Sequence, residues 1–259
     1  MIKLIASDLD GTLVNDYEQS LSEETIETLK KLHKKGIIFV AASGRQYSNM
    51  RSLFAPLGFD IPYISENGSL CIWNDKLLST GSIPPETICQ ILDGLDEYEQ
   101  TFHMRNCIFS VKDSYLTDSK DEDFIRALRE RNNQVIQVDN LRDVKETILK
   151  IAIFDMNGTK NLEPFFKKRV GDQIRVATAA THWLDFIAPN ANKGLALQTL
   201  MDQFGIKKEE CICFGDQSND LEMLRCAGTS YAMQSAIPEV KEQADNVVPS
   251  VLSVLSQLV

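Results

Sequence analysis

Short apolar runs alternate with helical patterns along the chain, and this alternation restricts the fold more than any other feature. Residues 3–7 are apolar enough for a first strand, residues 22–35 begin with acids and end with lysines as helices do, and residues 37–42 form a second apolar run. Together they make a β-α-β unit, which predicts a parallel sheet with helices on its faces. The same rhythm returns late in the chain, with strands and helices expected at 184–188, 194–204, 210–214, 219–226 and 230–233.

The middle of the chain differs in character. Residues 69–73 and 76–80 flank Asn74-Asp75 and predict a hairpin. A Gly- and Pro-containing linker at 81–85 follows it. Beyond the linker, helices are expected near 86–98, 122–131 and 162–169, and strands near 109–116, 150–155 and 175–179. The sequence therefore predicts a Rossmann-like α/β core made of residues 1–82 and 184–259, with an α+β module inserted at residues 83–183.

Composition limits the classes of partner. The 259 residues contain 27 Lys and Arg against 37 Asp and Glu, a net charge of −10, which argues against general binding to nucleic acid or to anionic membranes. The longest apolar stretch, near residues 37–42, is far too short to span a membrane. An acid at position 8 interrupts any signal-peptide pattern, and the six cysteines form no C-x-x-C pair. We therefore expect a cytoplasmic protein with reduced thiols; nothing in the sequence indicates its oligomeric state.

Two aspartates follow the first strand directly, in Asp8-Leu9-Asp10-Gly11-Thr12. Ligands of open α/β sheets bind beyond the carboxyl ends of the strands, so these acids lie where a site is expected. Neighbouring carboxylates repel each other, and a divalent cation with oxygen ligands, Mg²⁺ above all, would neutralise them. A solvated acidic turn is the alternative interpretation of this string.

Three further strings follow predicted strands. Each offers groups that suit a phosphate or a metal, although a turn, a surface lysine or a helix cap would explain each one alone. They are Ser43-Gly44-Arg45, Lys193-Gly194, and Gly215-Asp216-Gln217-Ser218-Asn219-Asp220. Lys193 opposes the dipole of the helix that it starts, which makes it a candidate site residue. One edge of one sheet would collect all four strings, and the combination of acids, hydroxyl, lysine and amide predicts binding of a metal and a phosphoryl group.

In order and content, the four strings resemble the motifs of the haloacid-dehalogenase-like (HAD) phosphatases. Only 33 residues separate Asp10 from Ser43, whereas 150 separate Ser43 from Lys193, enough for a large cap after the second motif. This spacing, with Glu66-Asn67-Gly68 before the hairpin, resembles the Cof-type subfamily IIB with a C2B cap. The resemblance implies that residues 83–183 form the cap.

The resemblance also implies roles for the residues. Asp8 would attack phosphorus and become an aspartyl-phosphate, and Asp10 would act as general acid and then general base. Mg²⁺ would be held by the carboxylates of Asp8 and Asp216 and by the backbone carbonyl of Asp10. Five residues would bind the phosphoryl oxygens. Leu9 and Gly44 would do so through their backbone N–H groups, and Ser43, Lys193 and Asn219 through their side chains. Supporting positions around these residues would be held by Thr12, Arg45 and Asp220.

The function expected from these features is Mg²⁺-dependent hydrolysis of small phosphorylated metabolites, such as sugar phosphates or related phosphomonoesters. A phosphosugar mutase of the same fold and a non-catalytic sensor of phosphorylated ligands are the alternatives. Four residues, His182, Trp183, Met104 and Arg105, are candidates for a substrate pocket, with cap core as the other interpretation. The physiological substrate cannot be read from the motifs, because the cap selects it.

Overall fold

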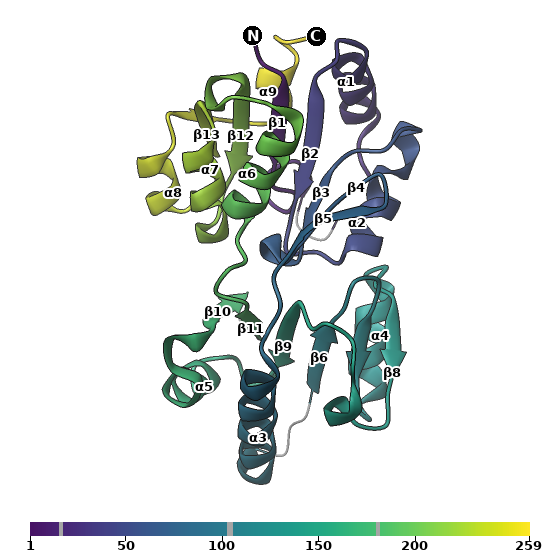
Figure 1. Cartoon of the computed structure of the whole chain (residues 1–259), viewed down its shortest axis with the longest axis vertical. Helices are drawn as coiled ribbons and strands as arrows, with labels where there is room; N and C mark the ends of the chain where they lie inside the picture. The colour runs from purple at the N-terminus through teal and green to yellow at the C-terminus, as the bar shows by residue number, and fades with distance from the viewer. Residues whose placement is uncertain (16–17, 103–105, 180–181) are drawn as a thin grey trace. The chain divides into compact units, whose positions relative to one another are not determined.

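The computed structural model describes residues 1–15, 18–102, 106–179 and 182–259. The chain forms two compact units (Figure 1). The first contains Met1–Thr80 and Asn192–Val259, and the second contains Gly81–Ala191. None of the helices in the described part of the chain is long and apolar enough to cross a bilayer.

An eight-stranded sheet forms the centre of the first unit, in the order β14-β13-β12-β1-β2-β3-β4-β5. The strands are β1 (Leu4–Ser7), β2 (Ile38–Ala42), β3 (Tyr63–Ser65), β4 (Leu70–Trp73), β5 (Lys76–Thr80), β12 (Cys211–Gly215), β13 (Thr229–Met233) and β14 (Asn246–Val248). From β14 to β3 every neighbouring pair is parallel, and the predicted hairpin adds β4 and β5 antiparallel at one edge.

Helices of the first unit precede or follow these strands along the chain. They are α1 (Glu23–Lys34), α2 (Tyr47–Phe54), α6 (Lys193–Phe204), α7 (Leu221–Cys226), α8 (Pro238–Gln243) and α9 (Leu252–Leu255). Short 3₁₀ turns lie at Ala55–Leu57, Glu66–Gly68, Lys208–Glu210 and Ser218–Asp220. The strand order runs away from β1 in both directions, through β2 and through β12, so the right-handed crossovers place α1 and α7 on opposite faces. The carboxyl ends of β1, β2 and β12 thus meet where the strand order reverses, the usual ligand position in such sheets.

Local signals explain α1 well. Ser22 caps the helix by accepting a hydrogen bond from the Thr25 N–H, and Glu23 and Glu24 stand in its first turn. Its last turn carries cations, and Gly36 follows with a φ of 76°. The helix bounds therefore agree with those expected from the sequence.

The second unit contains a six-stranded sheet in the order β10-β11-β9-β6-β7-β8. Its elements are α3 (Pro85–Phe102), β6 (Asn106–Ser110), β7 (Tyr115–Thr117), α4 (Glu122–Glu130), β8 (Val135–Gln137), β9 (Lys150–Phe154), α5 (Leu162–Val170), β10 (Arg175–Ala179) and β11 (Trp183–Ile187), with 3₁₀ turns at Leu141–Asp143 and Gly171–Gln173. Helix α4 packs on one face of this sheet through Phe124, Ile125 and Leu128.

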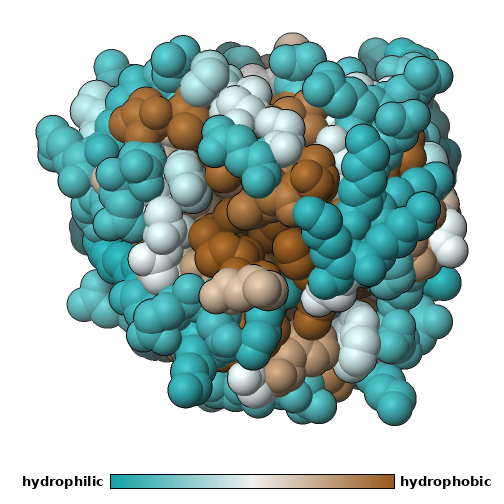
Figure 2. Space-filling model, turned by 90° about the horizontal axis from the view of Figure 1, so that it is seen from above, coloured by the Kyte–Doolittle hydropathy of each residue, from teal (hydrophilic) through white to brown (hydrophobic). Residues whose placement is uncertain are grey.

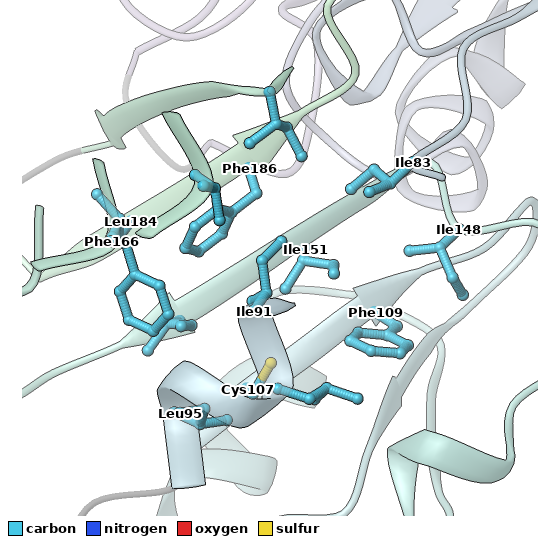
Figure 3. Packing of buried hydrophobic residues seen from close by; sticks show 14 of the residues in the cluster. Ile83, Ile91, Leu95, Cys107, Phe109, Ile148, Ile151, Phe166, Leu184 and Phe186 are labelled. Carbon is cyan, nitrogen blue, oxygen red and sulfur yellow. The ribbon is translucent and has the colours of Figure 1, made fainter. Parts of the chain in front are cut away.

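The opposite face of this sheet carries the larger apolar cluster. Figure 3 shows Ile91 and Leu95 of α3 and Phe166 of α5 packed toward Leu184 and Phe186 of β11. All of these side chains are at most 1% exposed. The two faces of the sheet are therefore covered by different helices, with α3 and α5 on one and α4 on the other.

Two sequence-based expectations about this region were wrong. The strand expected at 184–188 belongs to the second unit, where β11 pairs antiparallel with β9 and β10, and not to the core sheet. Its apolar alternation is the same in either sheet, so the local pattern does not identify its partners. The single strand expected near 109–116 is a hairpin of β6 and β7, closed by the hydrogen bond from the Val111 N–H to the Ser114 carbonyl.

The expected fold class, a parallel α/β core with an inserted α+β unit, is confirmed.

Many of the residues on the face of the molecule shown in Figure 2 are hydrophilic. In Figure 2, polar side chains surround a smaller apolar area near the centre of the face. Charged residues make up 25% of the sequence.

We expect Gly68→Ala to be much more destabilising than Gly58→Ala. Both glycines have left-handed backbones, with φ of 96° and 77°. A Cβ at Gly68 would overlap the Asn192 backbone, whereas a Cβ at Gly58 would meet nothing within 4 Å. Strain and overlap together should cost about 3 kcal/mol at Gly68, against about 1 kcal/mol at Gly58. Urea denaturation of the two variants measures the difference, and equal losses would contradict it.

Candidate active site

The loop after β1 buries the first aspartate. The Asp8 N–H donates to the Phe214 carbonyl of β12 at 3.0 Å, and the Asp8 residue is 6% exposed. Gly11, with a φ of 78°, turns the chain, and the N–H groups of Thr12, Leu13 and Val14 all donate to the Leu9 carbonyl. This compact turn fixes the direction of the Asp8 carboxylate at the carboxyl end of the sheet.

Lys193 is fully buried at the start of α6. Asn192 caps the helix by accepting a hydrogen bond from the Leu195 N–H at 2.7 Å. The Lys193 Nζ donates to Asp8 Oδ1 at 2.5 Å and to Asp220 Oδ1 at 2.7 Å. A helix N-terminus disfavours a cation, so the two carboxylates supply the compensation that the helix dipole does not. The lysine therefore joins three segments of the chain at one point.

Asp220 also closes the loop that follows β12. Its Oδ2 accepts hydrogen bonds from the N–H groups of Asp216 and Gln217, both at 3.0 Å. Gly215 makes this closure possible, because a Cβ there would lie only 2.5 Å from the Cβ of Asp220. Asp220 is fully buried. One carboxylate thus orients both the lysine and the backbone that carries Asp216.

Asp216 is held from both sides. Thr12 Oγ1 donates to its Oδ1 at 2.9 Å, and Gln217 Nε2 donates to its Oδ2 at 3.0 Å. The bond from Thr12 connects the loop after β1 to the loop after β12. Both bonds leave further lone pairs on the carboxylate for a ligand, since each oxygen can accept two hydrogen bonds.

Three aspartates in this region lie close enough together to hold a metal ion. Asp8, Asp216 and Asp220 each place a carboxylate oxygen within 4.8 Å of the other two. Such a set of hard oxygen donors fits Mg²⁺ chemistry. The charges fit as well, because three carboxylates surround the single ammonium of Lys193 and leave an excess of negative charge.

The pKa values reflect this excess. Burial raises the pKa of Asp8 well above its ordinary value; the ammonium of Lys193 opposes the shift, and the charges of Asp220 and Asp216 add to it. Burial also raises the pKa of Asp216. For Lys193, burial alone would lower the pKa, but Asp220 and Asp8 outweigh it and raise the value. The lysine therefore stays charged, and a bound cation would favour the ionised form of the acids.

Asp10, the second acid of the first motif, is bound by Arg45. Arg45 donates two hydrogen bonds to the carboxylate of Asp10, from Nε to Oδ2 at 2.9 Å and from Nη2 to Oδ1 at 2.6 Å. The guanidinium also donates to the carbonyl of Glu18 at 2.8 Å. The Asp10 side chain is 35% exposed and that of Arg45 only 10%. Arg45 therefore holds the Asp10 carboxylate directly, in a position that solvent can reach.

A third group forms around Asn67. Ser43 follows β2 and is 2% exposed, and its carbonyl accepts a hydrogen bond from the Asn67 N–H at 3.1 Å. The Asn67 Oδ1 accepts from Asn219 Nδ2 at 2.9 Å. Gly44 packs so closely against Asn67 that a Cβ there would lie 2.9 Å from Asn67 Oδ1. Asn67 thus connects the second and fourth motifs.

Sequence reasoning did not include Asn67 among the site residues. The signal was present in Glu66-Asn67-Gly68, where three successive residues have φ of 49°, 58° and 96°. Left-handed conformations of non-glycine residues are strained and gather at functional sites. In the sequence this string shows only a family resemblance, whereas the folded chain shows that its left-handed backbone places Asn67 beside Asn219.

In the first unit, the expected site residues form three groups, and the residues within each group contact one another. They are Asp8, Thr12, Lys193, Asp216 and Asp220; then Asp10 and Arg45; then Ser43, Gly44 and Asn219 around Asn67. Trp183 and His182 lie in the second unit. Met104 and Arg105 lie outside the described residues.

Known proteins are similar to this chain over most of its length. The sequence profile of the haloacid dehalogenase-like hydrolases matches residues 5–253. The chain is 30% identical to the 5-amino-6-(5-phospho-D-ribitylamino)uracil phosphatase YbjI of Escherichia coli, over 91% of this chain and 86% of that protein. It is 29% identical to the HMP-PP phosphatase of Cronobacter sakazakii, over 93% of this chain and 87% of that one.

Solved structures are similar over nearly the whole chain. A structure from Eubacterium rectale has 31% sequence identity and a TM-score of 0.87, covering 100% of this chain and 99% of that one. A structure from Thermotoga maritima has 27% identity and a TM-score of 0.85, covering 99% and 97%. Both units of the fold therefore have counterparts in these structures.

Replacing Lys193 by Met should destabilise the metal-free protein. Two buried carboxylates lose their counter-charge, at an expected cost of about 3 kcal/mol at neutral pH. Their pKa values then rise further, so the loss should shrink as the pH falls toward 4 and protons replace the ammonium. Urea denaturation across this pH range measures the effect.

Lys167→Met is the matched control, because the Lys167 ion pair with Glu163 is exposed. It should cost at most about 0.5 kcal/mol. A loss of that small size for Lys193→Met, or one independent of pH, would show that the buried ion pairs do not stabilise the fold.

Proposed function

Because the chain belongs to the haloacid dehalogenase-like hydrolases and is a phosphatase of the Cof type, we propose that it hydrolyses small phosphomonoesters with Mg²⁺ through a phosphorylated Asp8. The observation that carries this proposal is the buried Lys193 ammonium held between Asp8 and Asp220 beside Asp216. A nucleophilic carboxylate, a cation-binding acid and a fixed positive charge lie together there, as phosphoryl transfer requires.

Asp8 is the nucleophile in this proposal. One of its carboxylate oxygens attacks phosphorus, the bond from phosphorus to the leaving oxygen breaks, and an aspartyl-phosphate forms. Lys193 holds the attacking group in place and stabilises the charge on the phosphoryl oxygens. Ser43, Asn219 and the backbone N–H groups of Leu9 and Gly44 bind the remaining oxygens.

Asp10 is the general acid and then the general base in this proposal. As an acid it gives its proton to the leaving oxygen, and as a carboxylate it then takes a proton from the water that attacks the aspartyl-phosphate. That second step releases inorganic phosphate and restores Asp8. Arg45 is a positioning residue here, since its two hydrogen bonds fix the carboxylate of Asp10.

Mg²⁺ would be held by the carboxylates of Asp8 and Asp216 and by the backbone carbonyl of Asp10. When bound, it neutralises charge on the phosphoryl group. Thr12 and Gln217 orient the Asp216 carboxylate for this role. Asp220 lies close to the other two acids, but its carboxylate oxygens accept hydrogen bonds from Lys193 and from two backbone N–H groups. We therefore do not include it among the proposed metal ligands.

The names of the relatives support a class of substrate. Proteins from Escherichia coli and Bacillus subtilis with 30% and 29% identity carry the name 5-amino-6-(5-phospho-D-ribitylamino)uracil phosphatase, and others are HMP-PP phosphatases. These names support small phosphorylated metabolites as the substrates of this chain, and we propose sugar phosphates or related phosphomonoesters among them. We propose that the second unit, Gly81–Ala191, acts as the cap that selects among them.

Asp8→Asn should abolish hydrolysis while the protein stays folded. Without the nucleophilic oxygen, Mg²⁺-dependent release of phosphate from 4-nitrophenyl phosphate should fall at least about 10³-fold. Mass spectrometry after acid quenching should find phosphate on Asp8 in the wild type only. Asp245→Asn is the control, because Asp245 bonds Ser230 and takes no part in the site.

Retained turnover in Asp8→Asn would overturn the nucleophile assignment. Transfer of the phosphoryl group to a second sugar hydroxyl without release of phosphate would identify a mutase instead. Tight binding of phosphometabolites without turnover in the wild type would identify a sensor.

Thr12→Val should weaken Mg²⁺ binding specifically. Loss of the hydrogen bond to Asp216 removes an orienting contact, and such losses cost about 10-fold or more in metal affinity. The Mg²⁺ concentration for half-maximal activity should rise about 10-fold, with kcat at saturating Mg²⁺ within about 3-fold of the wild type. Thr28→Val, at a buried threonine of α1, is the control. An unchanged Mg²⁺ requirement in Thr12→Val would refute this role.

A further inference from the structure

Asn67 contacts two of the loops that carry proposed phosphate ligands. Its N–H donates to the carbonyl of Ser43 at 3.1 Å, and its Oδ1 accepts from Asn219 Nδ2 at 2.9 Å. The Asn67 side chain also lies against Gly44, where a Cβ would be only 2.9 Å from Asn67 Oδ1. One residue outside the four motifs therefore contacts Ser43, Gly44 and Asn219, three of the residues expected to bind the phosphoryl group.

The backbone around Asn67 has an unusual conformation. Glu66, Asn67 and Gly68 have φ of 49°, 58° and 96°, and left-handed residues other than glycine persist only where their surroundings hold them. A Cβ at Gly68 would lie 2.2 Å from the carbonyl carbon of Asn192, the residue before Lys193. The segment is therefore also packed against the start of α6, and this packing fixes the position from which the Asn67 side chain reaches Asn219.

The orientation of the Asn219 amide determines whether it can bind a phosphate. Its nitrogen is a donor, whereas its oxygen is an acceptor and would repel phosphoryl oxygens. Because Asn67 Oδ1 accepts from Asn219 Nδ2, the nitrogen end of the amide is held in a fixed place. That bond uses one of the two N–H groups of the nitrogen, so the second can donate to a phosphoryl oxygen.

Resting on the proposed phosphatase function, we propose that Asn67 is a positioning residue that acts through Asn219. Its side-chain oxygen keeps the nitrogen of the Asn219 amide, rather than the oxygen, available to the phosphoryl group. Its backbone N–H holds the loop of Ser43 at a fixed distance from that amide. Donors that are oriented before the substrate binds stabilise the charge of the transition state without a further cost of reorganisation.

Two replacements of Asn67 separate positioning from a purely structural role. Asn67→Gly removes the amide and tolerates the left-handed backbone, so kcat/KM for 4-nitrophenyl phosphate should fall about 10-fold in a folded protein. Asn67→Ala removes the same amide but strains the backbone. It should lower kcat/KM by the same factor, although its urea midpoint should fall further. An Asn67→Gly variant with wild-type activity would overturn the proposal, because only the backbone would then matter.

Asn74→Gly is the matched control. Asn74 is also left-handed, with a φ of 49°, but it lies exposed in the turn between β4 and β5 of the same unit. The same replacement there should leave kcat/KM within about 2-fold of the wild type. An equal loss of activity in Asn74→Gly and Asn67→Gly would contradict a specific role of Asn67.

A double variant tests whether Asn67 acts through Asn219. Asn219→Ala removes a donor to the phosphoryl group and should lower kcat/KM about 100-fold. Once that amide is absent, Asn67 has nothing to orient, so adding Asn67→Gly should lower kcat/KM by no more than about 2-fold further. Losses that multiply in the double variant would show that the two residues act independently and would refute the proposal.

Binding of inorganic phosphate separates this proposal from the proposed function. Calorimetry in the presence of Mg²⁺ compares the wild type, Asn67→Gly, Asn219→Ala and the double variant. Both single variants should bind phosphate more weakly than the wild type, and the double variant no more weakly than Asn219→Ala. This pattern supports positioning even if the wild type hydrolyses nothing, a result that would refute only the phosphatase function.

Two results of the binding experiment would count against Asn67. An unchanged phosphate affinity in Asn67→Gly would refute the positioning role even in an active enzyme. A wild type that binds no phosphate in Mg²⁺ would refute both the positioning role and the proposed function.

Discussion

The two ion pairs of Lys193 hold the site of the first unit together. Its ammonium is fully buried, which is tolerated only because Asp8 and Asp220 both bond to it. Through these bonds the start of α6 is tied to the loops after β1 and β12. Asp220 in turn fixes the backbone of Asp216, and Thr12 connects that acid back to the first loop. The geometry of Asp8, Asp216 and Asp220 therefore depends on one buried charge and its two partners.

The same cluster explains how an acidic protein can bind an anionic substrate. The chain carries a net charge of −10, and a phosphate would be repelled by most of its surface. Three buried carboxylates surround one ammonium, so the site itself is also negative until a cation binds. A bound divalent cation would offset this excess, because its two positive charges and that of Lys193 equal the three negative charges of the carboxylates. Binding of a cation and binding of a phosphate would thus be linked by charge.

Much of this site was predictable because its residues follow strands whose local signals are strong. Strand β1, helix α1 and strand β2 are defined by apolar runs, a serine cap and a glycine stop. The apolar pattern of β11 was equally clear, but a pattern does not specify which strands will pair with it, and its expected sheet was wrong. Asn67 was missed because its part in the site depends on a left-handed backbone and on Asn219, 152 residues away. The hydrogen bond from Arg45 to Asp10 likewise could not be predicted, because it joins residues that meet only in the folded chain.

The two units place different demands on sequence. The proposed catalytic residues of the first unit follow the ends of strands, so they appear in the sequence as short motifs in a fixed order. Substrate selection, which we assign to the second unit, requires only that suitable side chains share a surface, and no motif marks them in the sequence. This difference explains why the reaction class can be inferred from the sequence while the substrate cannot.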